Sequence, residues 1–444
     1  MKIKFFGFLF FLFASLVSNA QTFNEKKLDN YFEALEKNQK FMGSVVLSHQ
    51  GEIIYSKAFG FDDIDTKEKS TTETKYRVGS ISKMFTSTLV LMAVEEGKLD
   101  LENTIETYFP EISNAEKITL RYLLNHSSGI YNFTNRKDNR SWSNVPRTRK
   151  ELIERIADSE SVFEPGSKNE YSNSNFILLT FILEDIYEKP YNEILKEKIT
   201  KPVGLPNTYL GSSTDFKNNE CYSYRFLGVW KKEDETDMSI PLGAGAVVSN
   251  PEDLTKFIEH LFDGKIISKN SLDKMTNTHE NYGLGIFSLN KAGKFGYGHN
   301  GGIDGFLSSL FYFPDEKLSI ALTSNGINYN KTEIEETLVK SFFDIEFDIP
   351  TFNTNQLSAT ELEKYTGVYK SETVPFAVSI VNEGEILLMK AEGQNSFFLE
   401  PNGKNIFSID LIQATIEFKL EENLMLFKRH EESHSFTRNK KDSF

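Results

Sequence analysis

The chain has 444 residues, with 50 Lys and Arg against 64 Asp and Glu and a formal net charge of -14. This length predicts two domains, and an acidic chain without a basic block argues against nucleic-acid binding. The single cysteine, Cys221, leaves no internal disulfide. The seven histidines are scattered without zinc-ligand spacing, so we expect neither a metal nor another cofactor.

Residues 1–20 have the pattern of a secretory signal. Lys2 and Lys4 precede an apolar run at 5–17 that is too short to span a bilayer, and small residues follow it. We expect cleavage before Gln21 and a secreted or periplasmic protein without an integral membrane segment. The alternative is a retained membrane anchor.

Between 21 and 345, the spacing of apolar residues predicts strands at both ends and helices between them. Helical patterns lie at 24–36, from Ser80 to a C-cap at Gly97, and at 118–124, 175–187, 251–261 and 334–343. Strand patterns lie at 43–48, 52–56, 295–299, 306–312 and 318–323, and a long polar loop occupies 131–148. We therefore predict an α/β (α+β sandwich) domain. In it, terminal helices cover one face of an antiparallel sheet and a helical subdomain covers the other.

The segment 346–357 carries Pro, Asn and Thr, and we predict that it is a linker. Seven short alternating runs follow, separated by turn residues. These runs predict a small all-β barrel or sandwich over 358–444. They lie at 367–369, 376–380, 386–389, 397–399, 406–407, 415–418 and 424–426.

Ser80 and Lys83 form a Ser-x-x-Lys pattern at the start of the second predicted helix. Residues three apart share a helix face, so the Lys83 amine can reach the Ser80 hydroxyl and activate it as a nucleophile. The helix N-terminus also favours a developing oxyanion. Alone, the pattern is weak, and a serine N-cap beside a solvated lysine explains it better. It recurs at Ser271/Lys274 and Ser288/Lys291.

Tyr171 and Asn173 form a Tyr-x-Asn pattern that occurs once in the sequence. A tyrosine can act as a general base where a nearby cation lowers its pKa from about 10, and Lys83 is a candidate for that cation. Asn173 can orient Lys83 and bind a substrate amide. The alternative is a turn with a half-buried tyrosine.

His299, Asn300, Gly301 and Gly302 lie in a glycine-rich segment, and glycines in a strand permit close approach of a ligand or of backbone. A free N–H at Gly302, paired with that of Ser80, would form an oxyanion hole. His299 would add a hydrogen-bond donor or a partial positive charge. The alternative is a hairpin with an incidental histidine.

In this order, the three patterns resemble the β-lactamase and penicillin-binding-protein superfamily of serine hydrolases. They are similar to the branch that holds class C β-lactamases, D-alanyl-D-alanine carboxypeptidases, D-amino-acid peptidases and family VIII esterases. The segments 123–130 and 243–254 also look like that branch, and the resemblance covers about residues 25–345. The tail from about 358 to 440 resembles a lipocalin-like β-barrel.

The resemblance implies that Ser80 is the acylated nucleophile and that Lys83 and Tyr171 share the proton transfers. Asn173 would position the substrate. The N–H groups of Ser80 and Gly302 would form the oxyanion hole. In the same comparison His126 would be structural.

The third pattern departs from the Lys-Thr-Gly that class C β-lactamases usually show. A histidine at 299 resembles the carboxypeptidase, D-aminopeptidase and esterase members. Asn300 replaces the threonine hydroxyl that would bind a substrate carboxylate, and Gly301 matches the glycine of the pattern. Efficient β-lactam hydrolysis is therefore not expected.

We predict a secreted serine hydrolase that acts through an acyl-Ser80 intermediate on an amide or ester. The expected partner is a small-molecule or peptide substrate, above all a D-amino-acid peptide hydrolysed in a carboxypeptidase-like manner. One alternative is a family VIII-type carboxylesterase. Another is a non-catalytic receptor for penicillin or peptidoglycan, and a third is a sensor that is acylated without turnover. The sequence leaves the oligomeric state open.

Overall fold

The computed structural model describes residues 23–352, 357–391 and 395–439. The expected signal segment at 1–20 lies outside these residues. Within the three described stretches, none of the helices combines the length and apolar composition that crossing a bilayer requires.

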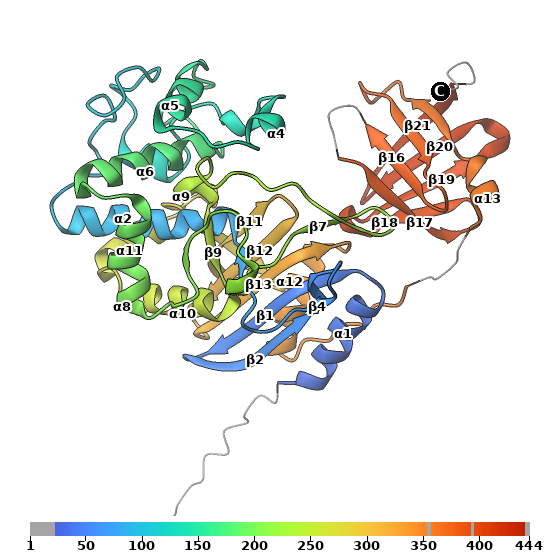
Figure 1. Cartoon of the computed structure of the whole chain (residues 1–444), viewed down its shortest axis with the longest axis horizontal. Helices are drawn as coiled ribbons and strands as arrows, with labels where there is room; N and C mark the ends of the chain where they lie inside the picture. The colour runs from blue at the N-terminus through green and yellow to red at the C-terminus, as the bar shows by residue number, and fades with distance from the viewer. Residues whose placement is uncertain (1–22, 353–356, 392–394, 440–444) are drawn as a thin grey trace, which may run out of the picture.

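A six-stranded antiparallel sheet forms the centre of the larger part of the molecule (Figure 1). Its strand order, β10-β11-β12-β13-β1-β2, joins strands from both ends of this part, as the sequence predicted. The strands are β1 (Phe41–His49), β2 (Glu52–Phe59), β10 (Phe287–Lys291), β11 (Lys294–Ile303), β12 (Phe306–Phe313) and β13 (Leu318–Ile327).

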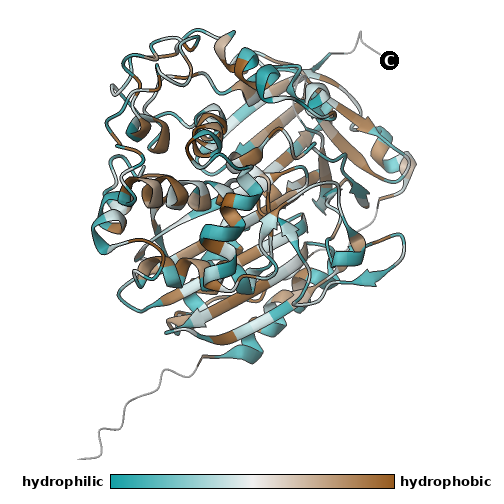
Figure 2. Cartoon of the chain, turned by 60° about the vertical axis from the view of Figure 1, so that its left-hand side comes forward, coloured by the Kyte–Doolittle hydropathy of each residue, from teal (hydrophilic) through white to brown (hydrophobic). Residues whose placement is uncertain are grey.

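Both faces of this sheet are covered by helices. On β12, Leu310 belongs to the core beneath the helical subdomain, whereas its neighbour Phe311 belongs to the core beneath α1 and α12. This alternation follows from the two-residue period of a strand. Figure 2 shows the resulting hydrophobic strands and the hydrophilic outer segments. The predicted α+β sandwich is thus confirmed.

The helices follow the predicted periodicity, with several short additions. They are α1 (Glu25–Lys37), α2 (Ser82–Glu95), α3 (Leu120–Leu124), α4 (Asn139–Trp142), α5 (Arg149–Ala157), α6 (Asn173–Tyr187), α7 (Tyr191–Leu195), α8 (Lys201–Val203), α9 (Leu242–Gly245), α10 (Pro251–Phe262), α11 (Lys269–Thr276), α12 (Lys331–Phe342) and α13 (Ala359–Glu363). The predicted loop 131–148 holds α4 and a 3-10 turn at Phe133–Asn135.

Three small sheets border the central one. They are formed by β3 (Phe61–Asp63) with β4 (Glu68–Lys69), by β5 (Tyr76–Arg77), β9 (Val247–Ser249) and β6 (Tyr209–Leu210), and by the hairpin of β7 (Tyr224–Phe226) and β8 (Trp230–Lys232).

A closed antiparallel barrel of eight strands follows. They are β14 (Gly367–Lys370), β15 (Val378–Asn382), β16 (Leu387–Ala391), β17 (Phe397–Gly403), β18 (Ile406–Ile409), β19 (Ala414–Lys419), β20 (Leu424–Arg429) and β21 (Glu432–Asn439). Buried side chains such as Phe407, Phe418 and Met425 fill its interior. The sequence predicted seven of these strands and missed β21, whose one buried apolar residue is Phe436.

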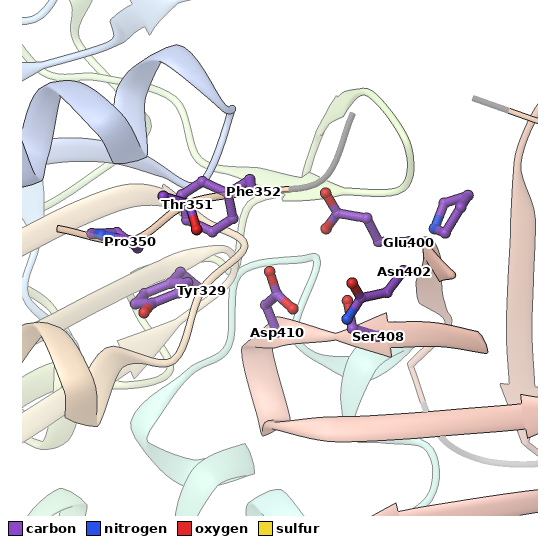
Figure 3. Close-up of a pocket in the computed structure, with 9 residues that line it drawn as sticks. Tyr329, Pro350, Thr351, Phe352, Glu400, Asn402, Ser408 and Asp410 are labelled. Atoms are coloured by element: carbon purple, nitrogen blue, oxygen red, sulfur yellow. The ribbon is translucent and has the colours of Figure 1, made fainter. Parts of the chain in front are cut away.

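The barrel meets the larger part at Lys40, which is completely buried. Lys40 Nζ donates to Glu400 and, over 2.8 Å, to Asp410 Oδ2. Figure 3 shows both carboxylates facing Phe352 and Tyr329 across a small pocket. Phe352 lies in the segment predicted as a linker, so the described part of that segment packs at this junction.

Candidate active site

Ser80 lies in a single 3-10 turn, Gly79–Ile81, that leads directly into α2. Gly79 has φ +53, and a Cβ atom built on it would lie 2.6 Å from the backbone nitrogen of Gly302. Only glycine fits this close approach without strain. The turn thus presses against β11 and places Lys83 one helical turn beyond Ser80, with 3.1 Å between Lys83 Nζ and Ser80 Oγ.

Lys83 is completely buried, and its amine has two further oxygen neighbours. Nζ donates to Asn173 Oδ1 over 2.8 Å and to the Ala244 carbonyl over 2.6 Å. Burial holds the pKa of the Lys83 amine well below its usual value of 10.5. A neutral amine has two N–H bonds, which these oxygens take, and one lone pair, which remains for the Ser80 hydroxyl.

Tyr171 is the second group in contact with Ser80 Oγ. Its hydroxyl donates to Ser80 Oγ over 2.6 Å, and its ring centroid lies 4.4 Å from that of His126. Burial raises the pKa of Tyr171 above its ordinary value, and the hydrogen bond with Ser80 only partly opposes this rise. The sequence-based expectation of a pKa lowered by a Lys83 cation is therefore wrong in direction, because burial disfavours charge on both groups.

His299 is buried beside Tyr171, with 6.2 Å between the ring centroids. Its Nδ1 lies against the carbonyl oxygen of Asn300 and therefore carries the proton. Burial lowers the pKa of His299 to about 3. His299 thus offers an unpartnered Nε2 acceptor within the described structure, rather than the expected donor or positive charge.

The three residues after His299 do not all reach Ser80. Asn300 Oδ1 accepts hydrogen bonds from Lys331 and Ser309 over 3.0 Å each, on the α12 side of the sheet. A Cβ atom on Gly301 would lie 1.9 Å from the Val78 carbonyl oxygen. Gly301 therefore allows the contact between β11 and the Ser80 turn, and Asn300 points away from it.

Ser80 opens onto a cavity of about 260 Å³. Its walls come from the loop 131–148, from α6, from the segment before β9 and from the end of β11. The lining residues are Ser80, Phe133, Thr134, Asn139, Ser143, Asn173, Ile177, Thr236, Ile240, Pro241, Ala244, Gly245, Gly302, Ile303 and Asp304. The cavity therefore brings Ser80, Asn173 and Gly302 together, although they are far apart in the sequence.

The Beta-lactamase family model matches residues 28–340, more than half of the chain. The chain belongs to the β-lactamase family. A penicillin-binding protein of Bacillus subtilis (strain 168) is 24% identical over 435 residues, 90% of this chain and 94% of its own length. Teichoic acid D-alanine hydrolase of Staphylococcus aureus (strain MRSA252) is 26% identical over 328 residues, 70% of this chain and 77% of its own.

Among solved structures, D-stereospecific amidohydrolase from Streptomyces sp. superposes with a TM-score of 0.59 at 27% identity, covering 67% of this chain and 94% of its own. This β-lactamase-family chain is thus a serine hydrolase by fold and by sequence. The family match ends before the barrel, whereas the similarity to the Bacillus protein extends over most of the chain.

The other two Ser-x-x-Lys patterns of this β-lactamase-family chain lack such surroundings. Ser271 lies on α11, where its backbone N–H is capped by Ser268. On β10, Lys291 is paired with Glu335 at 2.5 Å. Residues three apart on a strand point to opposite faces, so Lys291 is directed away from Ser288.

A charged cluster that the sequence did not predict reaches the cavity through one residue, Asp304. Arg77 is buried, and its guanidinium donates to Asp304 Oδ2 over 3.0 Å and to Glu235 Oε2 over 2.6 Å. Arg77, Glu235 and Asp304 are far apart in the sequence, so no local sequence pattern could predict that they cluster. Among the described residues, no group of three or more His, Cys, Asp and Glu could hold a metal ion.

Proposed function

We propose that this protein is an acyl-serine hydrolase of D-aminoacyl amides or esters. One observation carries the proposal: Ser80 Oγ lies 3.1 Å from a completely buried lysine amine and 2.6 Å from the Tyr171 hydroxyl, at the wall of a cavity. A serine hydroxyl between a neutral amine and a proton donor is arranged for nucleophilic attack.

In the proposed acylation, the Lys83 amine takes the Ser80 proton while Ser80 Oγ attacks the substrate carbonyl carbon. The backbone N–H groups of Ser80 and Gly302 stabilise the oxyanion, which is typically a large part of the rate enhancement. The Tyr171 hydroxyl then passes a proton to the leaving nitrogen or oxygen and recovers it from Lys83. Water releases the acyl group by the reverse proton transfers.

The proposed substrate class rests on the relatives and on the charge of the cavity. Two of the three relatives named above are a D-stereospecific amidohydrolase and a teichoic acid D-alanine hydrolase. Among the described residues that line the cavity, Asp304 is a carboxylate and none is Lys or Arg. A substrate carboxylate would have no cationic partner there, which favours a D-aminoacyl amide or ester over a carboxypeptidase substrate.

The test is intact mass with peptide mapping after incubation with a fluorophosphonate and, separately, with a labelled penicillin. We expect a fluorophosphonate adduct on Ser80 that is lost in Ser80→Ala and kept in Ser271→Ala and Ser288→Ala. An adduct elsewhere, or none in the folded protein, would refute the assignment and favour a receptor. A stable penicillin adduct would instead point to D-Ala-D-Ala-type recognition.

Hydrolysis of D-alanine and L-alanine p-nitroanilides by the wild-type chain tests the substrate class, and we expect the D-form to be preferred. Release of D-alanine from a D-alanyl ester tests the ester alternative. Preference for the L-form would contradict the proposed class without affecting the assignment of Ser80.

We also propose that the protein is exported, because residues 1–20 have the pattern of a cleaved signal. Expression in a bacterial host followed by mass measurement of the extracellular or periplasmic protein tests this. A mature chain that begins at Gln21 is the expected result, and a full-length chain retained in the membrane fraction would contradict it.

A further inference from the structure

The β7–β8 hairpin extends from the larger part of the molecule to the barrel (Figure 1). At its tip, the Phe226 ring lies 5.5 Å from the Phe398 ring at 79°, an edge-on contact. Gly228 leaves no room for a side chain, because a Cβ atom there would lie 2.4 Å from Ile386 Cγ2. The tip is therefore packed on barrel side chains.

A third contact joins the tip to the barrel and to the base of the hairpin. Arg225 Nη1 donates to Asn395 Oδ1 over 2.9 Å, and Arg225 Nη2 donates to Glu233 Oε2 over 2.9 Å. Glu233 N–H in turn donates to the Ser223 carbonyl over 2.9 Å and closes the hairpin. One arginine thus connects the barrel with the start of the segment 233–241.

The base of the hairpin rests against the active-site end of β11. Gly305 N–H donates to Ser223 Oγ over 3.1 Å. Beyond the hairpin, Thr236 N–H donates to Asp304 Oδ1 over 3.0 Å, and Asp237 N–H donates to the Ser143 carbonyl over 2.9 Å. Thr236, Asp304 and Ser143 all line the cavity. The segment 233–241 therefore builds one cavity wall.

We propose that the barrel is a positioning domain for the active site, and that Phe398 and Phe226 are positioning residues that hold the cavity wall 233–241. A two-stranded hairpin is marginally stable by itself, and this one is held at its base, where Tyr224 is buried, and at its tip, where it packs on the barrel. The Lys40 contact with Glu400 and Asp410 seats the barrel at a second point, which gives the hairpin tip a fixed support. Only the kinetic test below rests on the proposed function.

The first experiment is hydrogen–deuterium exchange of the full chain in Phe398→Ala and Ile386→Ala, with Phe376→Ala as control. Phe376 is a barrel phenylalanine that is 37% exposed. In both test variants we expect faster exchange at the Thr236, Asp237 and Ile240 amides, with unchanged exchange in the central sheet. The control is expected to match the wild type. Unchanged exchange at 233–241 in both folded test variants would overturn the proposal.

The second experiment measures hydrolysis of D-alanine p-nitroanilide and of p-nitrophenyl acetate. In Phe398→Ala we expect KM for the anilide to rise about two- to tenfold, because the ordered wall is populated less, with kcat for the small acetate unchanged. In Phe226→Ala/Phe398→Ala the effect is expected to equal that of one substitution, because both remove the same contact. Additive effects, or a wild-type KM, would contradict the proposal. If the wild type hydrolyses neither probe, the proposed function fails. The hydrogen–deuterium exchange experiment alone then decides whether the barrel positions the cavity wall.

Discussion

At the scale of single residues, the main feature is a lysine amine without a charged partner in the protein interior. Lys83 is surrounded by Asn173, Ala244 and the ring of Tyr171, whose centroid lies 4.8 Å from Nζ. None of these groups carries a negative charge that would retain the proton. Burial therefore favours the neutral amine, which is the form that can accept the Ser80 proton.

Replacement of Lys83 by Met is expected to lower the acylation rate by about 10²–10⁴-fold, because the proton acceptor is lost. The pH dependence of the stability of the same variant tests whether the pKa of Lys83 is lowered in the folded protein. Between that pKa and 10.5, the unfolded chain holds a proton that the folded chain lacks, so the stability of the wild type rises with pH. Urea unfolding across this range should show the rise in the wild type and a smaller rise in Lys83→Met. Parallel curves would contradict it.

Replacement of Asn173 by Asp is expected to reverse the electrostatic environment of Lys83. A carboxylate 2.8 Å from Nζ favours the charged amine, raises the pKa of Lys83, and moves the acid limb of the acylation rate to higher pH. The measurement is the rate of fluorophosphonate labelling against pH. Asn135→Asp, at an exposed position in the segment 131–148, is the control and should leave the profile in place.

At the scale of elements, β11 joins the sheet to the active site. Alternation along this strand directs His299 to the Tyr171 side and Asn300 to Lys331 on the α12 side. The two glycines that follow let the Ser80 turn lie directly against the strand. The pattern at 299–302 therefore serves mainly to let the backbone of β11 contact the Ser80 turn, and it contributes few side chains to the active site.

Neighbouring substitutions on β11 should have unequal effects. In Gly301→Ala, the new Cβ would lie 1.9 Å from the Val78 oxygen and 2.2 Å from Ser308 Oγ, so the Ser80 turn must move. We expect a loss of about 1–3 kcal/mol in stability and a large loss of labelling. In Gly302→Ala the nearest atom lies 3.4 Å away, so stability near that of the wild type is expected. Thermal unfolding of both variants checks this, and equal losses would contradict it.

At the scale of the whole molecule, several contacts join the barrel to the larger part, and two of them bear on the active site and on the junction. One is the hairpin packing on Phe398, and the other is the ion pairing of Lys40 with Glu400 and Asp410. The interior of the barrel is filled by the barrel's own side chains. The contacts with the larger part are therefore made by residues on the barrel surface.

Replacement of Lys40 by Met should destabilise the junction, because it leaves two partly buried carboxylates facing each other. Breaking a fully buried ion pair typically costs about 3–5 kcal/mol, so we expect a loss of about 2 kcal/mol here. The side chains of Glu400 and Asp410 are 23% and 21% exposed, which moderates the loss. Lys40→Met/Glu400→Gln/Asp410→Asn should recover most of it in urea unfolding. No recovery would show that charge is not the cause.

Much of the fold could be predicted because its signals are local. Apolar periodicity indicated five of the six strands of the central sheet, α2 and seven barrel strands. β21 was missed because polar side chains occupy most of it and Phe436 alone is buried as an apolar residue. β10 and α11 were missed as well. Both are short, and the turns around them carry the same polar residues as a loop.

By itself, the sequence determined the Ser80–Lys83 pair, because a spacing of three residues along a helical turn brings both groups to the same side. The tertiary structure alone decided that Tyr171, 91 residues away, donates to Ser80, and that the Ala244 carbonyl binds Lys83. It also decided the protonation of the site, because the pKa of a buried group depends on what surrounds it in space. Residues distant in the chain supply those surroundings, so no local pattern could reveal them.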